Sequence, residues 1–91
     1  MQIFVKTLHK EDVVILMVDP QDLVGSVKGM VVNLLKEQDG LEIKRRDFSL
    51  RFQGGDYLEV SATMRECGVE QYALLEMVTG IRVRGSGRSM R

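Results

Sequence analysis

Apolar and polar positions along the first eighteen residues predict two strands. Residues 1–8 alternate, with the apolar side chains of Met1, Ile3 and Val5 on one face of the predicted strand. A period of two is typical of a strand with one buried face. Residues 13–18 are all apolar and follow four polar residues, so the two segments predict an antiparallel hairpin.

A helix is predicted over residues 23–37. Apolar residues recur there at spacings of three and four, which places them on one face of the helix: Val24, Val27, Val31, Leu34 and Leu35. Asp22 is the expected N-cap and Gly40 the expected left-handed stop. Gly25 and Gly29 each disfavour a helix by about 0.5–1 kcal/mol relative to alanine. Burial of the apolar face must therefore stabilise this helix.

The second half of the chain predicts the remaining strands. Residues 48–52 alternate, Tyr57 and Leu58 suggest a short strand after a glycine pair, and residues 73–78 form the last strand. Between the last two of these strands, residues 63–68 are predicted to form a single turn that begins with a hydroxyl cap and ends at a glycine.

One helix can cover a single sheet of these strands only if the first and last strands lie side by side and parallel in its centre. We therefore expect an α+β β-grasp fold with a mixed sheet of four to five strands and one helix across it. The alternation and the helical stripe predict these core residues: Ile3, Val5, Val14, Leu16, Val18, Val24, Val27, Val31, Leu50, Leu75 and Met77.

Composition limits the chain to one small domain, which we expect at residues 1–78, followed by a flexible basic tail at 79–91. The 91 residues carry 13 basic and 13 acidic side chains, so the formal net charge is zero. All acidic residues lie at or before Glu76, whereas four arginines follow it. A neutral chain whose basic tail lacks aromatic residues is not expected to bind nucleic acid.

The sequence contains few residues that could form a catalytic or metal-binding site. The single cysteine, Cys67, cannot form an intramolecular disulfide or a four-ligand zinc site by itself, and it fits a reducing compartment. With His9 it would be the only nucleophile and base, and no third group is identifiable. We expect no enzyme activity, small-molecule substrate, cofactor or metal.

The longest apolar run, residues 13–18, is too short to cross a bilayer, and the chain opens without a basic and apolar leader. We therefore expect no membrane span and no secretion. The domain is expected to be a monomer in the cytoplasm or nucleus.

At several segments the sequence resembles the ubiquitin family. Residues 1–8 match the opening of ubiquitin without a mismatch, residues 18–22 are similar to its strand end Val-Glu-Pro-Ser-Asp, and residues 50–54 to its Leu-Ile-Phe-Ala-Gly turn. The resemblance covers about 80 residues and implies a ubiquitin-like interaction domain whose partners are proteins, including those of the ubiquitin and proteasome system.

The recognition patch that this resemblance implies is altered. Where the family has leucine, isoleucine and valine beside a histidine, this chain has Leu8, Arg51 and Val78 beside Glu76. A guanidinium in the centre of the patch would need a polar partner that ordinary ubiquitin receptors lack. We therefore expect such receptors to bind poorly, and we expect Arg51 and Glu76 to form an exposed ion pair on adjacent strands.

The end of the chain departs from a conjugated modifier, which ends in Leu-Arg-Leu-Arg-Gly-Gly. Allowing a two-residue insertion, Arg82, Arg84 and Gly85 match that pattern, but Ser86 replaces the last glycine. The sequence therefore favours an interaction domain that is not itself conjugated. The alternative is a divergent modifier, processed at a C-terminal glycine and attached to target proteins.

Overall fold

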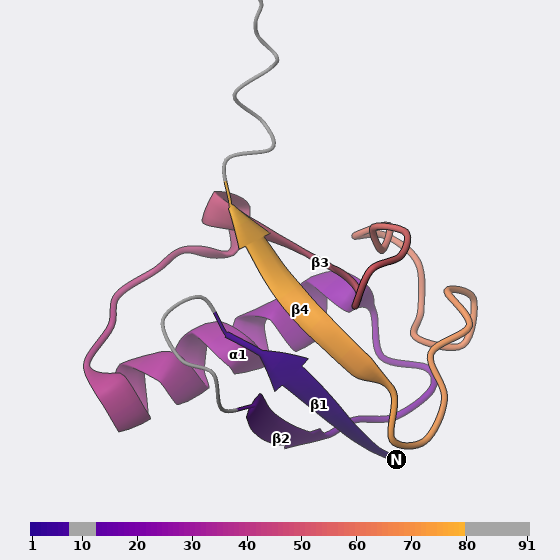
Figure 1. Cartoon of the computed structure of the whole chain (residues 1–91), viewed down its shortest axis with the longest axis horizontal. Coiled ribbons are helices and arrows are strands. Elements are labelled where there is room, and N and C mark those ends of the chain that lie inside the picture. The colour runs from indigo at the N-terminus through magenta and orange to yellow at the C-terminus, as the bar shows by residue number, and fades with distance from the viewer. Residues whose placement is uncertain (8–12, 80–91) are drawn as a thin grey trace, which may run out of the picture.

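Strands and one long helix form in the computed structural model where the hydrophobic patterns predict them. The structure describes residues 1–7 and 13–79, so residues 8–12 and 80–91 lie outside the described residues. Thr79, expected to begin the tail, is instead the last residue of the final strand. The elements in chain order are β1 (Gln2–Lys6), β2 (Val13–Met17), α1 (Val24–Asp39), the short 3-10 turn η1 (Arg45–Asp47), β3 (Phe48–Phe52) and β4 (Leu74–Thr79) (Figure 1).

The strands form one mixed sheet in the order β2-β1-β4-β3. β1 pairs antiparallel with β2 and parallel with β4, and β4 pairs antiparallel with β3. This arrangement confirms the predicted β-grasp architecture, with the first and last strands in the centre. The fifth strand expected around Tyr57 is reduced to an isolated bridge with Arg51 and a hydrogen bond of 2.9 Å from the Leu58 N–H to the Leu50 carbonyl.

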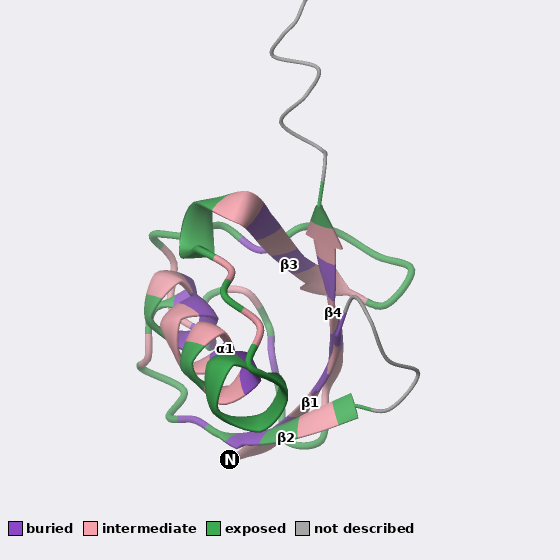
Figure 2. Cartoon of the chain, turned by 90° about the vertical axis from the view of Figure 1, so that its left-hand side faces the viewer, coloured by how far each residue is buried: buried purple, intermediate pink, exposed green. Residues whose placement is uncertain are grey.

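The hydrophobic core lies between α1 and one face of the sheet. Figure 2 shows α1 on one side of the strands, with its buried positions turned towards them. Of the eleven predicted core residues, ten are buried, and Val14 is half-buried because its strand is at the edge of the sheet. Five further apolar side chains complete the core: Leu35, Phe48, Leu58, Met64 and Val69.

The two ends of α1 are determined differently. Gly40 ends the helix as predicted, with a left-handed φ of 65°. The N-cap prediction is wrong: Leu23 occupies that position without a side-chain cap, and the Asp22 carboxylate instead accepts the Asp19 N–H at 2.9 Å. Loop carbonyls bind the first helical N–H groups, because Val24 donates to Ala62 at 2.9 Å and the next residue donates to Val60.

The turn at residues 63–68 forms as predicted and is joined to the start of the helix. The Glu66 N–H donates to Thr63 Oγ1 at 3.0 Å, and the Thr63 N–H donates to Glu66 Oε1 at 2.9 Å, which is a reciprocal cap. Gly68 has a φ of 80°, and the Met64 N–H donates to the Asp22 carbonyl at 2.9 Å. These bonds join the turn to the segment that leads into α1.

A charged side chain placed in the core should destabilise the domain, because the core positions are buried. Val27 on α1 is 0% exposed, so Val27→Asp should unfold the domain, because a lone buried carboxylate costs several kcal/mol against a total stability of about 5–15 kcal/mol. Asn33→Asp, at an exposed position of the same helix, adds the same charge and should leave the domain folded. Circular dichroism and amide chemical-shift dispersion distinguish the two outcomes. A folded Val27→Asp variant would contradict this assignment of the core.

Candidate protein-binding surface

The sheet face opposite α1 brings together three of the four residues that the sequence nominates. Leu75 and Met77 of β4 and Leu50 of β3 are buried, so the alternating positions point to the other face. The register pairs Arg51 with Glu76 and places Val78 opposite Ser49. The fourth residue, Leu8, lies outside the described residues, as do Arg82, Arg84 and Gly85 of the suggested conjugation tail.

Arg51 and Glu76 form the predicted ion pair, and it is more buried than expected. Arg51 Nε donates a hydrogen bond to Glu76 Oε2, and the two side chains are 33% and 17% exposed. Tyr57 adds an aromatic face 5.6 Å from the guanidinium carbon. The hydrogen bond to Glu76 raises the pKa of Arg51, an effect that partial desolvation opposes and the negative charge of Glu76 reinforces. An ion pair therefore lies at the centre of the nominated residues on the outer face of the sheet.

An exposed apolar stripe runs along the edge strand β2, which the sequence analysis did not nominate as a site. We call Val13, Ile15 and Met17 the β2 stripe; they are 40%, 57% and 65% exposed. Their neighbour Leu16 faces the core, so the stripe lies on the outer face of the sheet. The sequence contained the signal for this exposed stripe. Residues 13–18 are all apolar, so assigning every second one to the core leaves the others on the outer face of the sheet.

The β2 stripe continues across the sheet through aromatic side chains. Phe4 on β1 is paired with Ile15 on one side and with Leu74 on the other. Its ring lies 6.3 Å from that of Tyr72, stacked at an interplanar angle of 24°. Tyr72 has a φ of 68°, and its N–H donates to the Gln2 carbonyl at 2.6 Å. A hydrogen bond to β1 thus accompanies the unusual backbone conformation of Tyr72.

The described part of the chain brings together few side chains of the kinds that ligate metals. No group of three potential metal-ligating side chains occurs among residues 1–7 and 13–79. Cys67 is half-buried against the core, and His9 lies outside the described residues. None of the described helices is long and apolar enough to span a membrane.

The chain matches no protein-family model, and comparison with the curated proteins gives no match either. The fold and the composition of its surfaces therefore provide the basis for a functional proposal.

Adjacent residues of β2 should respond differently to truncation. Leu16 is buried, so Leu16→Ala should destabilise the domain by about 2–5 kcal/mol. Ile15 is 57% exposed, so Ile15→Ala should cost less than about 1 kcal/mol, chiefly through strand propensity. Chemical denaturation measures both changes. Equal losses would show that β2 is not oriented as described.

Proposed function

We propose that this chain is a ubiquitin-like protein-protein interaction domain that is not itself conjugated and that binds its partner through the outer face of the sheet. The observation that carries the proposal is the exposure of the β2 stripe on a face that α1 does not cover. A row of exposed apolar side chains is typical of a surface that a partner covers.

Composition divides this surface into two halves that suit different parts of a partner. The half formed by the β2 stripe and Phe4 is apolar, and its burial would supply most of the binding free energy. The half around Arg51 and Glu76 is charged, with the exposed ring of Tyr57 beside it. A partner that desolvates the pair without offering hydrogen bonds would lose affinity. The paired charges therefore favour selectivity over affinity.

Site-specific photo-crosslinking in cells tests the proposal. A benzophenone amino acid at Met17, within the stripe, should give discrete adducts of higher mass. The same group at Glu37, an exposed position of α1, is the matched control and should give few. Adding Ile15→Asp should abolish the Met17 adducts, because it places a charge in the apolar contact. Identical adducts from both positions would contradict the proposal.

Receptors that recognise the apolar patch of ubiquitin should fail to bind this domain. Titration with a ubiquitin-associated domain should give no saturable amide shift below millimolar concentration, because Arg51 and Glu76 occupy the centre of the patch. Replacing both residues, Arg51→Ile with Glu76→His, should restore measurable affinity. Tight binding of the unmodified domain at these residues would refute the role assigned to the charge pair.

A further inference from the structure

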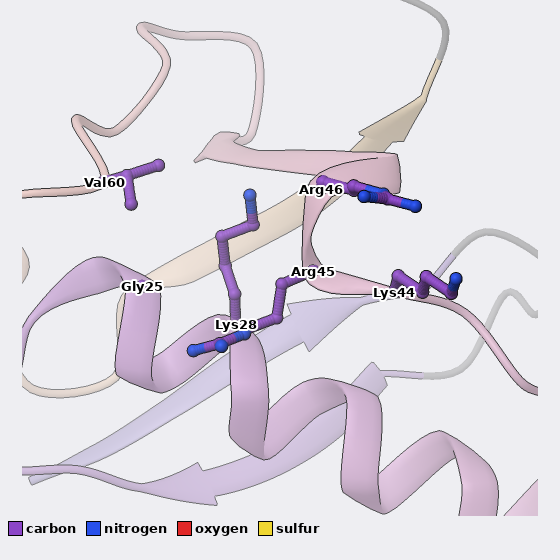
Figure 3. Close-up of a pocket in the computed structure, with 6 residues that line it drawn as sticks. All are labelled: Gly25, Lys28, Lys44, Arg45, Arg46 and Val60. Carbon is purple, nitrogen blue, oxygen red and sulfur yellow. The ribbon is translucent and has the colours of Figure 1, made fainter.

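A cleft on the helical side of the molecule gathers positive charge. It has a volume of about 650 Å³ and lies between the first turns of α1, the η1 turn and the loop at Val60. Its lining residues are Gly25, Lys28, Lys44, Arg45, Arg46 and Val60 (Figure 3). None of these lining residues belongs to the outer sheet face described above, so the cleft is a separate surface.

The charge of the cleft contrasts with that of the domain around it. Residues 1–78 contain nine basic and thirteen acidic side chains, yet four of the nine basic ones line this single cleft, and none of its lining residues is acidic. Asp47 follows Arg46 directly in the chain, and its carboxylate accepts the Lys44 N–H at 3.0 Å. Such a local concentration of cations attracts anions even when the whole chain is neutral.

Two of the cations lie at the centre of the cleft. Figure 3 shows Lys28 rising from α1 between Val60 and η1, and Arg45 extending back across the helix, whereas Lys44 and Arg46 project away from Val60. Lys28 is 6% exposed, and its ammonium lies 5.1 Å from the centre of the Phe48 ring. Within the described part of the chain, the Arg45 guanidinium forms no hydrogen bond or ion pair. Arg45 therefore has donors available for a ligand.

Two glycines lie on the face of α1 that Arg45 and Val60 approach. Gly25 and Gly29 are four residues apart, so they lie one above the other on the same face of α1. A Cβ at Gly29 would lie 3.6 Å from Arg45 Cδ, and one at Gly25 would lie 3.2 Å from Val60 Cγ1. The contact at Gly29 is an ordinary van der Waals distance, whereas a side chain at Gly25 would crowd Val60, so only Gly25 is needed for the close approach.

We propose that this cleft binds a small anion bearing phosphate groups. Guanidinium groups match the geometry of phosphate oxygens and can donate two parallel hydrogen bonds, while ammonium groups supply compact positive charge. The volume lies within the range of small-molecule sites. The first helical N–H groups already donate to Ala62 and Val60, so side chains must provide the recognition. The phosphate groups belong either to a soluble compound or to a lipid headgroup.

Titration of the full chain distinguishes these two sources. One arm uses inositol hexakisphosphate and inorganic pyrophosphate, observed through amide shifts. The other uses phosphatidylcholine vesicles with and without phosphatidylinositol bisphosphate, observed by co-sedimentation. Saturable shifts centred on Gly25, Lys28 and Arg45 support a soluble ligand. Sedimentation that requires the phosphoinositide and is lost on Arg45→Gln supports a headgroup. Absence of binding in both arms overturns the proposal.

Two pairs of variants locate the site. Arg45→Gln should weaken binding about tenfold, because it removes charge-assisted hydrogen bonds. Arg65→Gln makes the same charge change at an exposed position outside the cleft and should leave binding unchanged.

The second pair is at Val60, which is 51% exposed, so substitutions there should preserve the fold. Val60→Glu should abolish binding by introducing a carboxylate into the cleft, and Val60→Gln should retain it. Equal effects within either pair, or shifts confined to the arginines after residue 79, would show nonspecific attraction and overturn the proposal.

Discussion

The parallel pairing of β1 with β4 is the constraint on which the rest of this structure depends. It joins strands that are about seventy residues apart in the chain and places them at the centre of the sheet. Hydrogen bonds from the Gln2 N–H to Gln71 Oε1 at 2.7 Å and from the Tyr72 N–H to the Gln2 carbonyl extend the connection beyond the ladder. Closing so long a loop is entropically costly, and burial of the helix against both strands must offset it.

This central pairing leaves the two sides of the molecule with different properties. One sheet face is covered by α1 and forms the core, while the other presents the β2 stripe and the Arg51–Glu76 pair to solvent. The helical side carries the basic cleft instead. Because a protein partner and a small anion would bind on opposite sides, the two proposed interactions do not compete for the same surface, and a variant in either can be examined without damaging the core.

Much of the sheet surface could be predicted from the chain because strand geometry is local. Once Leu50, Leu75 and Met77 are assigned to the core, alternation places Arg51 and Glu76 outside, and antiparallel neighbours can then form an ion pair. The position of Tyr57 beside that pair could not be predicted, because Tyr57 comes from a separate loop and meets Arg51 through an isolated bridge.

The sequence by itself determined which faces of the strands and helix are apolar, since periods of two and of three to four are properties of neighbouring residues. Gly40 ends the helix for a similarly local reason, its left-handed φ. Only the tertiary structure decided that loop carbonyls, rather than Asp22, would bind the first N–H groups of α1. It also decided that Lys28 and Arg45 would line one cleft. The physical reason is that these contacts join distant segments, whose meeting depends on the packing of the whole chain and leaves no periodic signal in the sequence.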